Sequence, residues 1–292
     1  MFWKRIGLFL LTNLVVLLVL GAVVSITGLD TGLSAYGLNL GALLVFSAIF
    51  GFGGALISLG LSRWMAKRAF GVVVIPPNTP DPQGRWLVET VARLARNAGL
   101  PATPEVGVYA SDEVNAFATG PSASRSLVAV STGLLARLDR REVEGVLGHE
   151  VAHIANGDMV TMTLLQGVLN TFVIFLSRVL GFVIGRAVGG RGEGLVRLLA
   201  ILILQVLFGI LASLVVAAYS RMREFRADAG GARLAGRDAM LGALLRLRLH
   251  ATAVENAQPA YAAMKIHGTP GWLRWFSTHP PLEERIARLN RG

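Results

Sequence analysis

Two long stretches without a charged residue dominate the first part of the sequence, residues 6–26 and 38–62. Each of them, folded as a helix, is long enough to cross a hydrocarbon core of about 30 Å. Lipid offers no partner for backbone N–H and C=O groups, so a spanning segment must pair them internally. A cleaved signal peptide is a poor alternative for the first stretch, because its apolar core is long and a second span follows at once. The sequence therefore predicts an N-terminal transmembrane hairpin over residues 1–62.

A second pair of apolar stretches occupies residues 159–184 and 198–219. The first of them contains Arg178, which is costly inside the bilayer unless it faces protein or water. The connection between them is basic and should resist export. Its arginines are Arg186, Arg191 and Arg197. We expect a second hydrophobic hairpin over residues 159–219, which either crosses the membrane in spite of these charges or enters it without traversing it.

The positions of basic residues predict the orientation of the chain. The outer ends of the first hairpin are basic, whereas the loop inside it carries only Asp30. The flanking basic residues are Lys4, Arg5, Arg63, Lys67 and Arg68. Under the positive-inside rule, both the N-terminus and residues 63–158 lie in the cytoplasm.

The absence of cysteine limits the chemistry that the chain can perform. With no cysteine in 292 residues, disulfides and thiolate metal sites are excluded, so any metal must be bound by His, Asp or Glu. The formal net charge is +10. In a membrane protein, a basic cytoplasmic surface indicates contact with anionic lipid. No nucleic acid partner is expected, because no recognised nucleic-acid-binding module accompanies the charge.

A metal-binding motif, HEVAH, follows in the segment between the two hairpins. His149 and His153 lie four residues apart, one turn above each other on a helix, so both imidazoles can reach one zinc ion. Glu150 would lie beside the attacking water as its general base. Apolar spacing predicts a helix over 140–156, and its charged first turn would be very costly in hydrocarbon. We therefore expect a soluble catalytic lobe rather than an intramembrane site; the alternative is two histidines and a glutamate solvated on a surface helix.

The third zinc ligand must come from another segment, because a hydrolytic zinc site uses three protein ligands and leaves a position for water. Glu224 and Asp228 stand out among the downstream candidates because they lie four residues apart on an expected helix. One of them could bind the metal while the other accepts a hydrogen bond from a ligating imidazole. Spacing alone does not separate this interpretation from a solvated helix face. The other candidates are Glu193, His250, Glu255, His267, His279, Glu283 and Glu284.

Short β-rich runs separated by Ser, Asp, Gly and Pro predict a small, mainly antiparallel sheet in the segment after the first hairpin. These runs are residues 72–75, 106–109, 116–119 and 127–131. Helical spacing occurs at residues 86–98 and again over most of residues 220–292. The fold class that follows is a mainly α membrane protein with a small β-sheet.

Several motifs together resemble the HtpX family of membrane zinc endopeptidases, which is related to the CAAX prenyl proteases. HEVAH is followed by NGD at residues 156–158, and EFRAD at residues 224–228 lies beyond a hydrophobic hairpin. VNAFATG at residues 114–120 and HPP at residues 279–281 also match, and the resemblance covers nearly the whole chain. It implies a zincin-like (gluzincin-type) α+β catalytic lobe attached to about four membrane helices. It also implies a multi-pass protein of the bacterial cytoplasmic (inner) membrane whose active site faces the cytoplasm.

The resemblance implies a role for each matching residue. His149, His153 and Glu224 would bind one Zn²⁺ ion, with Glu150 as the general base. Asp228 would accept a hydrogen bond from a ligating histidine, most plausibly His149. Arg285 and His279 would lie near the site, with His279 helping to stabilise the oxyanion. The strand Asn115, Ala116 and Phe117 would pair with an extended substrate by strand addition.

The resemblance also implies a division of the chain and a class of substrate. The transmembrane hairpin 1–62 would be followed by a cytoplasmic catalytic segment 63–158, the second hairpin 159–219, and a cytoplasmic segment 220–292 that carries the third ligand. Substrates would be polypeptides, misfolded or membrane proteins cleaved in quality control. Two alternatives stay open: a prenyl-peptide (CAAX-type) protease, and a non-catalytic membrane scaffold whose zinc is structural and bound by four protein ligands.

Overall fold

The structure, a computed structural model, describes residues 37–257 and 277–291. The first predicted span, residues 6–26, lies outside the described residues. The described chain forms two compact units. The first contains residues 37–58 and 162–216, and the second contains the remaining described residues.

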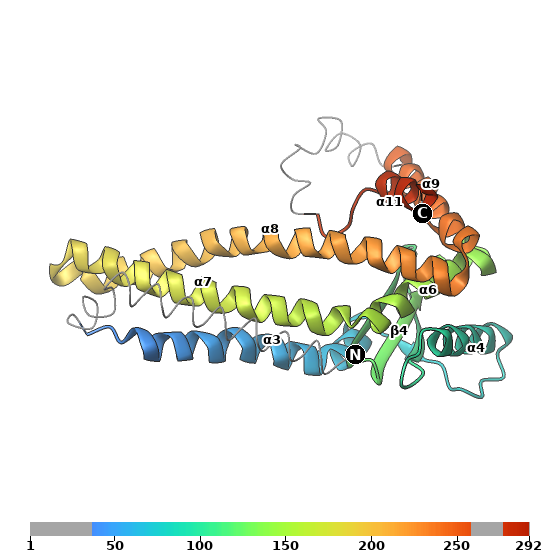
Figure 1. The fold of residues 1–292 in the computed structure, drawn as a ribbon, viewed down its shortest axis with the longest axis horizontal. Helices are drawn as coiled ribbons and strands as arrows, with labels where there is room; N and C mark the ends of the chain where they lie inside the picture. Colours follow the sequence, from blue (N-terminus) through green and yellow to red (C-terminus); the bar gives the residue numbers. More distant parts are fainter. Residues whose placement is uncertain (1–36, 258–276, 292) are drawn as a thin grey trace. The chain divides into compact units, whose positions relative to one another are not determined.

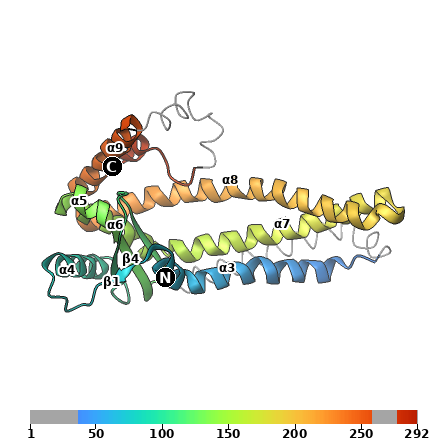
Figure 2. The ribbon, with the colours of Figure 1, turned by 180° about the vertical axis from the view of Figure 1, so that it is seen from behind.

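The first unit is built from long apolar helices. They are α3 (Leu40–Phe70), α7 (Asp158–Val188) and α8 (Glu193–Ala235), and they run alongside one another in both views (Figures 1 and 2). Within the described chain, three helical segments are long and apolar enough to cross a membrane, and they contain these three helices. This confirms the membrane fold class predicted from the charge-free stretches.

Small residues let these helices approach closely, as is common in membrane bundles. A Cβ added to Gly167 of α7 would lie 2.6 Å from the Phe52 ring of α3, and one added to Gly185 would lie 2.8 Å from Arg197 Cβ of α8. Arg178 is half-buried, and its guanidinium lies 5.0 Å from the centre of the Phe46 ring. Arg178 therefore faces protein, which reduces the cost of its position in an apolar helix.

Helix α8 does not end where its apolar stretch ends. Its 43 residues continue without a break from the apolar segment 198–219 to Ala235. At 1.5 Å per residue such a helix is about 65 Å long, roughly twice the hydrocarbon thickness. One helix therefore carries both an apolar stretch and the Glu224 and Asp228 side chains.

The second unit contains a four-stranded mixed sheet. Its strands are β1 (Val73–Val74), β2 (Glu105–Tyr109), β3 (Ala116–Ser122) and β4 (Arg125–Ser131), in the order β1-β2-β4-β3. The β1–β2 and β3–β4 pairs are antiparallel, as predicted, but the central β2–β4 pair is parallel. The tight β3–β4 hairpin places β4 against β2, and this leaves β3 at the edge of the sheet.

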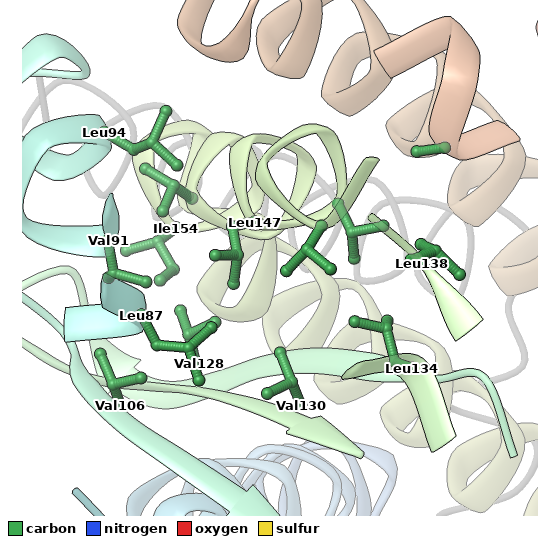
Figure 3. Packing of buried hydrophobic residues seen from close by; sticks show 14 residues of the cluster. Leu87, Val91, Leu94, Val106, Val128, Val130, Leu134, Leu138, Leu147 and Ile154 are labelled. Carbon is green, nitrogen blue, oxygen red and sulfur yellow. The ribbon is translucent and has the colours of Figure 1, made fainter. Parts of the chain in front are cut away.

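Helices α4 (Pro82–Asn97) and α6 (Arg140–Asn156) pack on one face of this sheet, and α5 (Thr132–Arg137) directly follows β4. Helix α9 (Arg237–Ala257) packs on α6, and α11 (Leu282–Arg291) packs on α9. Leu147 and Ile154 of α6 pack against Val128 and Val130 of the sheet, and α4 closes the same core with residues such as Leu94 (Figure 3). These side chains are almost fully buried, which fixes α6 firmly on the sheet.

Helix α6 has the bounds that the sequence predicts, and local signals explain them. Asp139 and Glu142 form a reciprocal capping box at its start. Gly157 ends the helix in the left-handed conformation with φ 64°, which glycine adopts at little cost. The histidine motif therefore lies on a rigid helix with defined ends.

Candidate metal centre

Three side chains from two helices converge in the second unit. The Nε2 atoms of His149 and His153 lie 3.1 Å apart on α6. One oxygen of Glu224 on α8 lies 3.4 Å from the first nitrogen, and its other oxygen lies 3.4 Å from the second. All three residues are buried. Among the described residues, this is the one group of three or more His, Cys, Asp or Glu side chains placed to hold a metal ion.

The separations fit a zinc ion. Tetrahedral zinc with bonds of about 2.0–2.1 Å places its ligand atoms about 3.3–3.4 Å apart. The observed separations of 3.1 and 3.4 Å are close to that value. Two imidazoles and a carboxylate are also a common ligand set of hydrolytic zinc.

Small residues at the crossing of α6 and α8 bring the carboxylate to the histidines. A Cβ added to Gly230 of α8 would lie 2.6 Å from Ala152 Cβ of α6, and one added to Gly231 would lie 2.9 Å from His149 N. Larger residues would hold the two helices apart. The contact therefore depends on the glycine pair that follows Asp228 in the sequence.

The ring of His149 is held by a carboxylate on its far side. Its Nδ1 lies 2.9 Å from Asp228 Oδ1, and Arg285 donates two hydrogen bonds to the same carboxylate, of 2.6 and 2.8 Å. Burial lowers the pKa of His149, but its hydrogen bonds with Asp228 and Glu224 outweigh burial and raise it. The structure therefore brings Asp228 and Arg285 together beside His149.

The ring of His153 is held in the same way by Asp158, the last residue of the NGD motif, for which the sequence predicts no role. Its Nδ1 lies 2.7 Å from Asp158 Oδ2, and Asp158 is only 1% exposed. Burial lowers the pKa of His153, but hydrogen bonds with Asp158 and Glu224 outweigh it and raise the pKa to about 9. Asp158 lies five residues after His153, beyond the glycine that ends α6, so helical spacing gives no signal for this contact.

A cavity of about 140 Å³ opens beside the three metal-binding candidates. His149, Glu150 and Glu224 line it, together with His279 and Arg285. The rest of its wall is mostly apolar. The apolar lining consists of Val114, Ala116, Leu134, Val146, Met240, Ala243, Leu244 and Leu247. A larger cavity of about 550 Å³ lies between β1, α4 and α5, and none of the candidate site residues lines it.

The remaining predicted residues lie at different distances from this cavity. His279 Nδ1 lies 3.0 Å from Glu224 Oε2, and the His279 side chain is 63% exposed. Asn115 and Ala116 line the cavity at the start of the edge strand β3. The Phe117 ring instead packs against Tyr109 and Phe70, in a hydrophobic cluster separate from the main core.

The chain is similar to known proteins of one family. The model of peptidase family M48 matches residues 81–291. The chain is 53% identical to a Protease HtpX homolog of Bacillus subtilis, covering 98% of each chain. It is 53% identical to Protease HtpX of Shewanella oneidensis, covering 98% of this chain and 99% of that one.

A solved structure supports the fold. The crystal structure of Ste24p from S. mikatae superposes with a TM-score of 0.58 at 18% identity, covering 96% of this chain and 66% of that chain. The family match, the full-length relatives, the apolar helices and the three clustered side chains agree with one another. The chain belongs to peptidase family M48 and is a membrane-bound metalloprotease of the HtpX family.

Proposed function

We propose that the protein is a zinc-dependent endopeptidase that cleaves misfolded or membrane proteins in quality control. We place it in the bacterial cytoplasmic (inner) membrane with its active site facing the cytoplasm, as the basic residues flanking the first hairpin predict. The observation that carries the proposal is the approach of two imidazoles and one carboxylate to 3.1–3.4 Å at the wall of a cavity that Glu150 also lines.

His149, His153 and Glu224 would hold one zinc ion. When bound, zinc supplies a Lewis acid that polarises the scissile carbonyl and favours attack by water near neutral pH. The cluster has three ligand residues rather than four among the described residues, as a hydrolytic site requires. This favours catalysis over the alternative of a structural zinc site.

Glu150 would transfer protons. Its side chain lies beside His149 on α6 and is 9% exposed at the cavity wall. From there the carboxylate accepts a proton from the attacking water and returns it to the leaving amine. His279 has Nδ1 next to Glu224, so its Nε2 would donate to the oxyanion of the substrate carbonyl only when both ring nitrogens carry a proton.

The edge strand β3 would bind the substrate backbone. β3 pairs only with β4 in the described sheet, so its outer edge has backbone groups available for an extended peptide. Asn115 and Ala116 at the start of β3 line the same cavity as Glu150, so a peptide paired with this edge would lie beside Glu150. An apolar cavity of about 150 Å³ is large enough to bind benzene, so this one suits a leucine or phenylalanine side chain of the substrate.

Cleavage of casein by the detergent-purified full chain tests the proposal. We expect cleavage that a zinc chelator abolishes and that added zinc restores. Glu150→Gln should lower the rate by at least about 10²-fold, the contribution of a general base, while zinc content stays the same. Glu144→Gln is the matched control on the same helix, because its only described ion pair is with Arg93 at the surface and contributes little.

Two results would overturn the proposal. Casein cleavage at the wild-type rate by Glu150→Gln would refute the assignment of the base. Cleavage restricted to farnesylated peptides would instead establish the prenyl-peptide protease alternative.

A further inference from the structure

The two histidines of the metal centre present the same nitrogen to the site. Both Nε2 atoms face Glu224, so both rings need their proton on Nδ1 to leave a lone pair for a metal. A carboxylate next to Nδ1 selects this tautomer, because it accepts the N–H hydrogen bond. Asp228 does so for His149, and Asp158 does so for His153.

The two carboxylates differ in their other partners. Asp228 receives two short hydrogen bonds from the buried Arg285, so much of its charge is already neutralised. The second oxygen of Asp158 lies 3.4 Å from Arg226, whose side chain is 54% exposed. The short contact of Asp158, at 2.7 Å, is the one with His153.

The burial of Asp158 indicates that its carboxylate has a defined partner. Asp158 is 1% exposed, and a buried carboxylate is costly unless it is paired and hydrogen-bonded. A simple alternative is that Asp158 serves helix α7, where it is the first residue and its charge suits the helix N-terminus. That role would be equally satisfied by an exposed carboxylate and does not require a contact with an imidazole.

We propose that Asp158 is the positioning residue of His153, whose Nδ1–H it accepts so that Nε2 is held toward Glu224 and the metal. This rests on the metal centre proposed above and adds a second carboxylate–histidine pair to it. Asp158 does not touch the substrate. It acts through the orientation and the basicity of the imidazole ring.

Zinc affinity of the detergent-purified full chain tests this role without any measurement of proteolysis. The dissociation constant is measured by competition with a chromophoric chelator, for the wild type, Asp158→Ala and Asp158→Asn. We expect Asp158→Ala to bind zinc about 10–100-fold more weakly, the usual effect of losing such a partner. Asp158→Asn keeps a hydrogen-bond acceptor but loses the charge, so we expect an intermediate affinity.

A matched control separates positioning from a helix-start role. Asp238 is an exposed acidic residue in the first turn of α9 and is not among the described residues that line the cavity of the metal centre, so Asp238→Asn removes a helix N-terminal charge without changing that lining. It should leave zinc affinity unchanged. The absorption spectrum of bound Co²⁺ provides a second readout, and we expect it to change in Asp158→Ala and not in Asp238→Asn.

Three outcomes have distinct meanings. Wild-type zinc affinity in a folded Asp158→Ala variant, with lowered thermal stability alone, would overturn the proposal in favour of the helix-start role. If Asp158→Ala does not fold, wild-type affinity in Asp158→Asn, together with an unchanged Co²⁺ spectrum, would overturn it. A wild type that binds zinc but cleaves no protein would refute the proposed proteolysis, while weaker zinc binding by the Asp158 variants would still support the positioning role.

Discussion

A single methyl group at Gly230 should damage the metal centre. The added Cβ of Gly230→Ala would lie 2.6 Å from Ala152 Cβ on α6. Carbon atoms pack at about 3.5–4.0 Å, so α8 has to move by about 1 Å relative to α6. Neither atom belongs to a flexible side chain that could turn away. Metal–ligand distances tolerate changes of only about 0.2 Å, so a shift of this size separates Glu224 from the two histidines.

Two opposing effects act on stability in this variant. Alanine is favoured over glycine inside a helix by about 1 kcal/mol. Overpacking a close contact costs about 1–3 kcal/mol. The net change in the free energy of unfolding is therefore small, from near zero to about 2 kcal/mol of destabilisation, whereas the predicted loss of zinc affinity is large.

Gly209→Ala is the matched control, because it lies on the same helix and an added Cβ there meets nothing within 4 Å. Zinc content and casein cleavage of the two variants are compared with thermal unfolding in the same detergent. We expect Gly209→Ala to keep its zinc and Gly230→Ala to lose most of it while still folded. Full zinc occupancy in Gly230→Ala would show that close packing of the two helices does not set the geometry of the site.

Three further predictions follow from the same site. Arg285→Met leaves the buried carboxylate of Asp228 without its guanidinium partner and should destabilise the protein by about 3–5 kcal/mol in thermal unfolding. Arg93→Met at a surface ion pair should cost at most about 1 kcal/mol. Equal shifts in the two variants would contradict the structural role of the Arg285–Asp228 pair. Because the pKa of His153 is raised to about 9 and that of His149 is raised as well, zinc binding at neutral pH must displace a proton. Apparent zinc affinity should therefore fall at least about tenfold per pH unit as the pH drops below 9. Calorimetry in buffers of different ionisation enthalpy should detect the released proton, and heats that do not depend on the buffer would refute this. Peptides with leucine or phenylalanine next to the scissile bond should be cleaved faster than peptides with tryptophan there. Leu247→Ala widens the cavity and should lower the ratio of the two kcat/KM values roughly tenfold. An unchanged ratio would argue against the cavity as the binding site of that side chain.

Local signals explain which features could be predicted from the sequence. The helix of residues 140–156 was predicted with its observed bounds, because a capping box, apolar spacing and a terminal glycine act within a few residues of one another. The two histidines follow from the same local periodicity. By contrast, the parallel pairing of β2 with β4 depends on how a hairpin folds back on an earlier strand, and no local pattern encodes it.

Contacts that depend on packing between distant segments were either left undecided by the sequence or not predicted from it. Spacing left Glu224 and Asp228 undecided between a metal site and a solvated surface, because their helix meets α6 only in the folded unit. Phe117 lies in the edge strand expected to bind substrate, and its ring packs in an aromatic cluster with Tyr109, a contact that spacing does not predict. The contact of Asp158 with His153 was missed because a left-handed glycine, rather than a helical turn, brings Asp158 back to the ring.

The glycine pair at residues 230–231 determines how closely α8 approaches α6, which the zinc motif alone does not specify. A motif of two histidines fixes two ligand atoms on one helix but says nothing about how closely a third can approach. Here the approach is set by backbone contact, since a Cβ on Gly231 would lie 2.9 Å from the amide nitrogen of His149 itself. The carboxylates of Glu224 and Asp228 then contact the two ring nitrogens of the same imidazole, Glu224 at Nε2 and Asp228 at Nδ1. In the segment from Glu224 to Gly231, the acidic residues therefore make the contacts with His149, and the glycines allow the two helices to approach closely enough for those contacts to form.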